Sequence, residues 1–550
     1  MKHVLTKVSC SFPSGEKLDL NTADFEKNGF TGCILEEAFC SIPYDPFYEA
    51  IGIDPSKEES QFISEAASNA LIAYESLVDR GLCGFAQLNP LAVPVAIWNQ
   101  LKESLLSSPG DEDTLLSEKA CEVFSYQLDQ LLETYPLLDG FVVPFGSVSI
   151  NKDFWSESSL SSVARSLDEE NCAKAIRSTL EYLTREVCEK RGKILIFQTY
   201  AADFDQFHND YEFYMKVTNE LEFSKRLLFS FHHVDGDFSR WLGFNRSLGM
   251  SRHSQLVEVD CSRENEGSGA LPIYVGKAVA EGFSEMVLKK GVNSIRGSQN
   301  WNGFILQGAS AKNEGSLNSL WSHLNAYSLA QYAGDPTLSE PVIFRKYVKD
   351  HLNLDGDDAV SFRELAVLSE GAVLKTFYCA VYDRNRKSGP VTNRWIRGKE
   401  LGGLPELIPV FDYIIQNGSI EAILMEKKEA VQEWDALLKI VDSLQCENQK
   451  ELKHRIQVSV QYGYYLAKII SVSWEVVLRG YSSRWVANVK FENRAELIES
   501  FDEAWESYQK LGEDPECPEL FVGKYGEIGD PQYSGLNVSV ENYRYFGYEV

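Results

Sequence analysis

Acidic side chains follow several short apolar segments of this chain, where they could carry acid–base chemistry. The acidic residues at these places are Glu36, Glu37, Asp235, Asp237, Asp260 and Glu264. In glycosidic bond cleavage, one carboxylic acid protonates the leaving oxygen while a carboxylate activates water or attacks the sugar. Carboxylates also bind divalent metal ions. The pattern therefore predicts a carbohydrate-cleaving site or a metal site.

The histidines favour the first of these alternatives. A metal-hydrolase barrel usually needs two histidines two residues apart on a strand, whereas His232 and His233 are adjacent. Adjacent side chains on a strand point to opposite faces, so these two cannot share one metal ion. The glycine-rich stretch 267–269 precedes no phosphate-binding Lys-Ser/Thr pair. We therefore expect no metal and no cofactor.

The elements that must position these residues alternate along the first 300 residues. Short apolar segments are followed by polar loops and amphipathic helical stretches, a pattern typical of a parallel sheet covered by helices. The predicted strands are Val4–Phe12, Gly32–Leu35, Cys83–Leu88, Gly140–Phe145, Ile194–Thr199, Leu227–Phe231, Leu256–Val259 and Val292–Ile295. Eight such segments favour a (β/α)8 TIM barrel, whose active site lies at the carboxyl ends of the strands. An open doubly wound sheet is the alternative.

The chain after residue 325 is almost wholly helical by its apolar spacing. We predict a barrel over 1–325, a helical C-terminal domain over 326–515 and an extended tail over 516–550. Aromatic residues at 462–465 could form a homodimer interface on these helices, although such a stripe also suits the core.

Composition excludes several classes of protein. The chain has 53 Lys and Arg against 81 Asp and Glu, so its net charge is −28. Such a charge repels nucleic acids and anionic membranes. No apolar run is long enough to span a membrane. The eleven cysteines are scattered without a Cys-x-x-Cys pair, which indicates buried thiols. We expect a cytoplasmic protein, or a periplasmic or secreted one if a signal peptide has been removed.

Several motifs resemble glycoside hydrolase family 67, the α-glucuronidases, over roughly residues 1–360. The most specific are Glu-Val-Asp-Cys-Ser-Arg-Glu-Asn-Glu-Gly at 258–267, which resembles strand seven of the family, and the helix opening at 325–336. The pair Asp237-Phe238 resembles the end of strand six, and 300–303 resembles an Asn-Trp-Thr-Gly motif. The resemblance implies an inverting hydrolase with Asp237 and Glu264 activating water. Two acids on neighbouring strand ends can orient one water molecule and take its proton.

The chain also departs from the family. At the position of the general acid it has Val148, which cannot donate a proton. The three family cations expected to bind the uronic carboxylate are replaced by Pro144, Gln198 and His232, and the amino-terminal β-sandwich of the family does not precede the first strand. We therefore expect a different, neutral glycone and a relocated acid. The candidates for that acid are Glu37, Glu36, Asp153 and Glu157.

The remaining expectations concern substrate contacts. The residues expected to bind the saccharide are His232, His233, Arg263, Gln198, Asn300 and Trp301. Trp301 follows the last predicted strand and could stack on a sugar ring or pack in the core. Arg263 could tune Glu264, bind a hydroxyl or form a structural ion pair. The competing functions are a barrel that binds sugar or protein without catalysis, and a metal-dependent isomerase.

Overall fold

The computed structural model describes most of the chain. The described residues are 3–10, 27–106, 114–148, 150–156, 158–234, 243–282, 301–307, 317–383, 404–446, 449–486, 490–518, 520 and 540. For Glu264, Trp301, 317–319 and 404–407 only the backbone is described.

Eight parallel strands close into a barrel in sequence order, with β1 paired to both β2 and β8. The strands are β1 (His3–Ser9), β2 (Gly32–Glu36), β3 (Cys83–Gln87), β4 (Gly140–Pro144), β5 (Ile194–Gln198), β6 (Leu227–His232), β7 (Ser254–Asp260) and β8 (Trp301–Gln307). The predicted (β/α)8 barrel is therefore confirmed. Seven of the predicted strands coincide with β1 to β7 to within a few residues.

The predicted eighth strand is wrong. Residues 292–295 lie outside the described residues, and β8 instead spans Trp301–Gln307, where it pairs with β7 and β1. Trp301 is opposite Gln255 near the start of β7, so it begins β8 at the amino end of the barrel. A strand is defined by its partners as well as by its apolar residues, and those partners are distant in the sequence.

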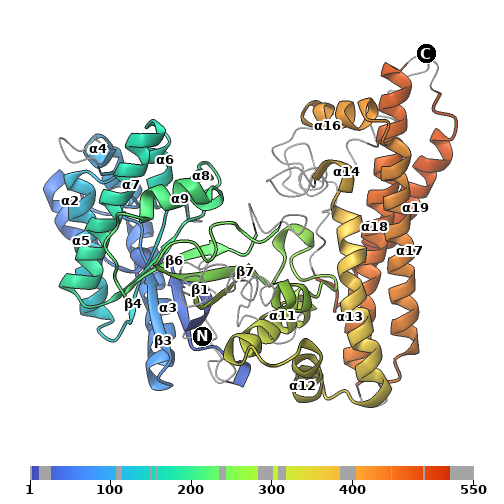
Figure 1. The fold of residues 1–550 in the computed structure, drawn as a ribbon, viewed down its shortest axis with the longest axis horizontal. Helices are drawn as coiled ribbons and strands as arrows, with labels where there is room; N and C mark the ends of the chain where they lie inside the picture. The colour runs from blue at the N-terminus through green and yellow to red at the C-terminus, as the bar shows by residue number, and fades with distance from the viewer. Residues whose placement is uncertain are drawn as a thin grey trace.

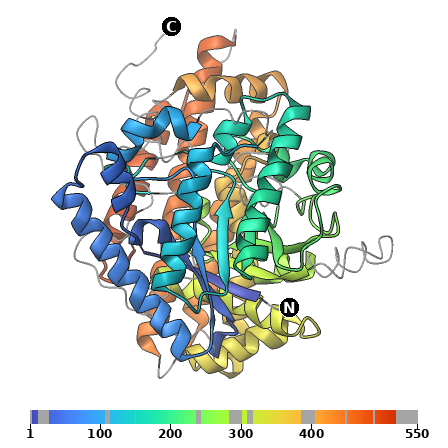
Figure 2. The same ribbon diagram turned by 90° about the vertical axis from the view of Figure 1, so that its left-hand side faces the viewer.

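Helices connect the strands, and polar side chains cap several of them. The elements between β2 and β7 are η1 (Ala38–Ser41), α2 (Asp45–Ile51), α3 (Lys57–Asp79), α4 (Val95–Leu106), α5 (Glu118–Thr134), α6 (Leu160–Ala164), α7 (Glu169–Thr184), the π-helix η2 (Arg185–Lys190), α8 (Gln206–Asn209) and α9 (Tyr211–Thr218). Ser56, Ser117 and Asp168 accept hydrogen bonds from backbone N–H groups in the first turns of α3, α5 and α7. Such caps stop the chain from fraying where each helix begins. Figure 2 shows these helices in front of the C-terminal ones.

The C-terminal part is helical, as predicted. After the short turn η3 (Glu264–Glu266) and β8, the helices are α11 (Leu317–Gly334), α12 (Glu340–Leu352), α13 (Gly356–Phe377), α14 (Ala380–Asp383), α16 (Leu404–Gln416), α17 (Ile420–Ser443), α18 (Lys450–Trp485) and α19 (Arg494–Leu511). Figure 1 shows α13, α17, α18 and α19 as a bundle beside the barrel. Helix α11 spans the predicted boundary at residue 325. The boundaries themselves stay predictions, and most of the predicted tail lies outside the described residues.

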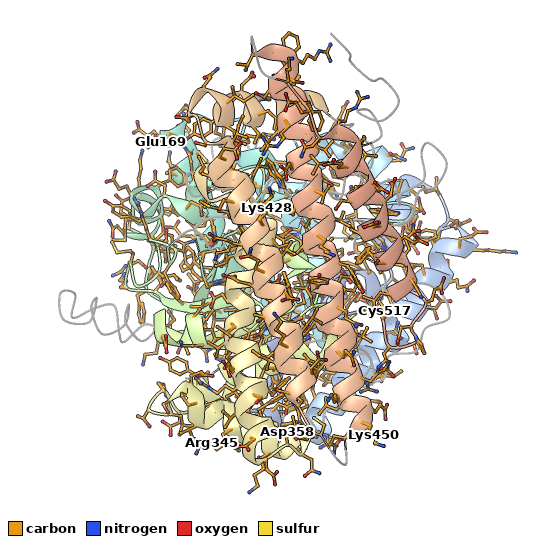
Figure 3. All side chains as sticks on the ribbon, turned by 90° about the vertical axis from the view of Figure 1, so that its right-hand side faces the viewer. Glu169, Arg345, Asp358, Lys428, Lys450 and Cys517 are labelled. Carbon is orange, nitrogen blue, oxygen red and sulfur yellow. The ribbon has the colours of Figure 1, made fainter. Side chains whose placement is uncertain are left out.

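The long helices pack through buried aromatic side chains. A Cβ atom on Gly463 of α18 would lie 2.2 Å from the Trp434 ring of α17, so only glycine allows this close approach. Trp321 of α11 donates its indole N–H to Ser459 of α18 at 2.6 Å, which joins α11 to the bundle. In Figure 3, Asp358 of α13 lies at the same end of the bundle as Lys450, the first residue of α18. There Asp358 accepts hydrogen bonds from the backbone N–H groups of 445 and 446.

Two expectations from composition can be compared with the structure. All eleven cysteines lie among the described residues; none forms a disulfide, and eight are buried, as expected. Of the helices described here, none has both the length and the apolar character needed to cross a membrane.

Tyr462, in the aromatic stripe considered for a homodimer, is buried inside the chain against Tyr508. A homodimer through other parts of the helical region stays a prediction.

Candidate active site at the carboxyl end of the barrel

Alternate residues of each strand point into the barrel, and an apolar layer fills its middle. One buried side chain from each strand forms this layer: Leu5, Ile34, Phe85, Val142, Ile196, Leu228, Leu256 and Ile305. Because side chains alternate along a strand, the residues two positions further on also point inward. On every strand except β4, which has Pro144 there, these residues are polar. They are Lys7, Glu36, Gln87, Gln198, Ser230, Glu258 and Gln307, and we call them the polar ring.

Glu258 of β7 makes the most contacts in the polar ring. Its Oε1 accepts hydrogen bonds from Gln198 Nε2 at 3.0 Å and from Ser230 Oγ at 2.6 Å. Its Oε2 accepts one from Gln307 Nε2 at 2.6 Å and lies 3.7 Å from the ammonium of Lys7. The side chain is 2% exposed. One buried carboxylate thus joins strands β1, β5, β6, β7 and β8.

The surrounding charges keep this carboxylate ionised. Burial alone would raise the pKa of Glu258, but Lys7, His232 and the hydrogen bonds from Ser230 and Gln198 hold it below its usual range. Burial alone would likewise lower the pKa of Lys7, yet the nearby carboxylates of Glu258 and Glu36 raise it above its ordinary value. A buried ion pair persists only when hydrogen bonds satisfy its remaining polar atoms, and here three hydrogen bonds satisfy the carboxylate of Glu258.

Glu36 and Lys7 face the open end of the barrel. Their ion pair measures 3.5 Å, and the side chains are 28% and 15% exposed. Glu36 is therefore a carboxylate of the polar ring that a substrate can reach. The same ammonium contacts Glu258 deeper in the barrel, so Lys7 connects an accessible carboxylate with a buried one.

The adjacent Glu37 is held differently. Its backbone is left-handed, with φ of 52°, and its N–H donates to Gln87 Oε1 at 3.1 Å. Its carboxylate accepts a hydrogen bond from Ser9 Oγ at 2.7 Å and is buried. The left-handed turn costs energy for a residue with a Cβ, and strained residues of this kind cluster at functional sites. Both predicted glutamates thus lie at the carboxyl end of the barrel, where Glu36 is the more accessible.

The two predicted histidines have separate surroundings. The ring of His232 packs against Tyr200 with centroids 4.1 Å apart, and its Nε2 lies 4.0 Å from Glu258 Oε2. The ring of His233 instead lies beside Phe244, and its backbone N–H donates to the carbonyl of Glu258. Tyr200, half-buried at the end of β5, offers an aromatic ring next to the polar ring.

The loop after β7 carries the predicted Arg263 and Glu264. Asp260 accepts hydrogen bonds from the backbone N–H groups of Ser262 and Arg263, which form a tight turn. The guanidinium of Arg263 is buried and donates to the carboxylate of Glu266. The described contacts of Arg263 match the structural ion pair more closely than a contact with substrate. Glu264 opens the turn η3, where only its backbone is described.

Several predicted site residues are not brought to the polar ring by the described structure. Asp237, Asn300 and Glu157 lie outside the described residues, so their roles stay predictions. Asp153 is exposed in the turn after β4, where its N–H donates to Asn151. Trp301 was expected at the carboxyl end of the last strand, and this placement is wrong because its backbone begins β8 at the opposite end.

Sequence reasoning missed Lys7 and Glu258 as site residues. Both are charged residues within a short apolar segment that forms a strand. This pattern is the signal that could have identified them, because a charge buried in a strand needs a partner. That Lys7 and Glu258 are partners follows only from closure of the barrel, since β1 and β7 are both paired with β8.

Within the described parts of the chain, no group of three or more His, Cys, Asp or Glu side chains is arranged to hold a metal ion.

Comparisons with known proteins support the fold. No protein-family model and no curated protein sequence matches the chain. A solved structure of a glycoside hydrolase family 138 enzyme that targets pectin rhamnogalacturonan II is similar, with a TM-score of 0.54 and 11% identity over 98% of this chain. The present chain covers 66% of that structure's chain, slightly less than two thirds of its length. A mutant O-GlcNAc hydrolase of Thermobaculum terrenum also matches, at 12% identity over 100% of this chain and 97% of the other, but its TM-score of 0.37 carries no argument.

Proposed function

We propose that this protein is a glycoside hydrolase whose active site lies at the carboxyl end of the barrel, above the polar ring. The observation that carries the proposal is the accessible carboxylate Glu36, which lies within a ring of hydrogen-bonding groups organised by Lys7 and Glu258. Sugars are bound by such groups through their hydroxyls. The similar family 138 structure and the resemblance to family 67 support a carbohydrate substrate.

The proposed reaction is hydrolysis with inversion. Asp237 and Glu264 orient a water molecule and accept its proton as the water oxygen bonds to the anomeric carbon. Glu36 or Glu37 donates a proton to the glycosidic oxygen as that bond breaks. Of the two, Glu36 is favoured because its side chain is accessible and on the inner face of β2. The products are two saccharides with free hydroxyl groups.

The charges at the strand ends favour a neutral glycone. Among the inward-facing residues at the carboxyl ends of the eight strands, the carboxylates of Glu258 and Asp260 accompany a single ammonium, that of Lys7, even when Glu36 is protonated as the general acid. Lys7 already forms an ion pair with Glu258. A uronic acid placed here would add another negative charge, and like charges in a partly buried site repel strongly.

Matched nitrophenyl glycosides test the substrate. We would compare glucoside with glucuronide and galactoside with galacturonide, in both anomers, and follow the products by NMR. The expected result is hydrolysis of one neutral sugar with inversion, at least about tenfold faster than its uronide, as expected for a barrier difference near 1.4 kcal/mol. Faster cleavage of the uronides would overturn the neutral glycone.

Amide substitutions test the carboxylates. Glu36→Gln, Glu37→Gln, Asp237→Asn and Glu264→Gln would be assayed beside Glu49→Gln, an exposed control on α2. Loss of a general acid or base is expected to lower kcat by about 10²- to 10⁴-fold. A residue whose amide variant keeps wild-type kcat is removed from the mechanism.

A barrel that binds sugar without cleaving it is the second candidate function. It is favoured by Val148, which occupies the position of the general acid in the resembling family and cannot donate a proton. Calorimetric titration of the same sugars separates the two functions. Binding without turnover of any glycoside in the panel would support the binding protein and overturn the hydrolase.

A further inference from the structure

The loop that follows β7 lies against the C-terminal helices. The carbonyls of Cys261 and Ile273 accept hydrogen bonds from Asn325 Nδ2 of α11 at 3.0 and 2.9 Å. The backbone N–H of Tyr274 donates to Ser369 Oγ of α13 at 3.3 Å. In Figure 1 this segment lies between the barrel and α13. The helical region therefore contacts the strand end that carries Glu264.

The backbone of this loop is strained. Arg263 and Ser268 have φ of 57° and 50°, in the left-handed region that residues with a Cβ rarely adopt, and Gly267 lies between them with φ of 101°. For Arg263 and Ser268 such conformations cost on the order of 1 kcal/mol or more each, so they persist only when surrounding contacts determine them. Asp260 supplies contacts from the barrel side, through its hydrogen bonds to 262 and 263.

A buried three-residue chain supplies the contacts from the helical side. The guanidinium of Arg263 donates to Glu266 Oε1, and the hydroxyl of Tyr378, just after α13, donates to the same oxygen at 2.6 Å. All three residues are buried. Burial alone would lower the pKa of Arg263, but Glu266, Tyr378 and Asp260 raise it above its ordinary value. The contact with the helical region is thus made at a charged pair inside the loop.

Tyr378 is itself held in place by α17. The ammonium of Lys427 is buried and donates to the carbonyls of Lys375, at 2.6 Å, and of Tyr378. The neighbouring Glu426 accepts a hydrogen bond from the backbone N–H of Ala380 at 3.1 Å. The end of α13 is therefore fixed on both sides of Tyr378, and its hydroxyl has a defined direction.

We propose that Tyr378 is a positioning residue for the active site. Its hydroxyl fixes Glu266 and, through Arg263, the strained backbone that presents Glu264 at the end of β7. The catalytic consequence rests on the proposed hydrolase function, whereas the structural consequence does not. On this view the C-terminal helices complete the active site from outside the barrel.

Tyr378→Phe tests the proposal because it removes only the hydroxyl. The matched control is Tyr481→Phe, which removes a hydrogen bond to Asp412 within the helical region, far along the chain from the loop. Amide hydrogen exchange in 261–270 should rise at least about tenfold in Tyr378→Phe, since a hydrogen bond to a charged group is worth roughly 1.5–3 kcal/mol. It should not rise in Tyr481→Phe. Both variants should lose similar thermal stability.

Kinetics supply the second readout. On the nitrophenyl glycoside that the wild-type protein cleaves fastest, Tyr378→Phe should lower kcat about tenfold and leave KM within about twofold, since misplacing a catalytic group affects the chemical step more than binding. Tyr481→Phe should keep both constants. Unchanged exchange in 261–270, or unchanged kcat with raised exchange, would overturn the positioning role. If the wild-type protein cleaves no glycoside, the hydrolase function fails while hydrogen exchange still decides whether Tyr378 holds the loop.

Discussion

At the residue scale, the organisation of the site depends on Glu258. A carboxylate this deeply buried is normally costly, and its retention requires nearly ideal partners. Gln198, Ser230 and Gln307 donate hydrogen bonds to it, and Lys7 supplies the opposite charge. Each of these donors belongs to a different strand, so the carboxylate also fixes the relative positions of the strand ends.

Replacing Glu258 should be strongly destabilising. Glu258→Gln leaves Lys7 without its buried counter-charge and places an amide N–H₂ where donors already converge, so we expect a loss of about 3–5 kcal/mol in the free energy of unfolding at pH 7. Because the folded pKa is lowered, this contribution is present above the unfolded pKa, about 4.3, and is lost as pH falls through the folded value. Urea titrations at pH 7 and pH 3.5 measure both effects. A loss below about 1 kcal/mol at pH 7 would contradict the assignment.

His253, just before β7, predicts a second pH dependence. Burial lowers its pKa to about 4, although its Nε2–H donates to the carbonyl of Thr218. The unfolded chain therefore takes up a proton first, and stability should fall as pH drops from about 6.5 to 4, by roughly 3 kcal/mol for this residue. His253→Gln should flatten the curve of unfolding free energy against pH over this interval. A variant curve parallel to that of the wild type would exclude His253 as a source.

At the element scale, β8 closes the barrel. Its Gly303 belongs to the 300–303 motif, in which Asn300 and Trp301 were expected to bind the saccharide, but this glycine has a structural role. Gly303 has φ of 149°, and a Cβ atom there would lie 1.5 Å from the carbonyl oxygen of His3 on β1. The glycine of the 300–303 motif is thus required where β1 and β8 pair at the amino end. The backbone of Trp301 lies at the start of the same strand, where β8 pairs with β7.

Gly303→Ala should therefore weaken closure of the barrel. The methyl group cannot fit without separating β1 from β8, and we expect destabilisation by more than about 3 kcal/mol, beyond the range of ordinary substitutions. Gly334→Ala is the matched control, because a Cβ at the end of α11 meets nothing within 4 Å. Thermal unfolding of both variants measures the difference. Equal melting temperatures would show that β8 accommodates a side chain at this position.

At the scale of the whole molecule, charge and helical packing act together on the site. The net charge of −28 repels anionic polymers, and the carboxylates at the strand ends repel anions as well. The C-terminal helices meanwhile contact the loop after β7 through Tyr378 and Asn325. If the proposed hydrolase function holds, discrimination against anionic substrates should thus begin before a ligand reaches the barrel.

The ionic strength dependence should show this repulsion. For a uronide substrate, kcat/KM should rise severalfold as NaCl increases from about 10 to 200 mM. Over this range the Debye length falls below about 10 Å, and salt screens the repulsion between charges that lie further apart than this length. For the matched neutral glycoside, kcat/KM should stay nearly constant. Steady-state kinetics on the glucoside and glucuronide pair measure the effect. A fall in kcat/KM of the uronide with salt would indicate an attracting site.

The sequence by itself predicted alternating strands and helices, which favoured a barrel over an open doubly wound sheet, and the end at which polar residues gather. Alternation of apolar segments with amphipathic helices is a local property, so seven strands and the helices α12, α13, α17 and α18 could be predicted from it. The opposite surroundings of His232 and His233 likewise follow from the period of a strand. Glu36 and Glu37 could be placed at the carboxyl end because they directly follow a strand.

Only the tertiary structure decided which residues meet. The position of β8 depends on its pairing with β1 and β7, which no local pattern encodes, so the segment 292–295 was preferred wrongly. Lys7 and Glu258 become partners because the barrel closes, and Tyr378 reaches Glu266 because α13 packs beside β7's loop. Local periodicity specifies which face of an element is buried, whereas contacts between distant segments arise only when the whole chain packs.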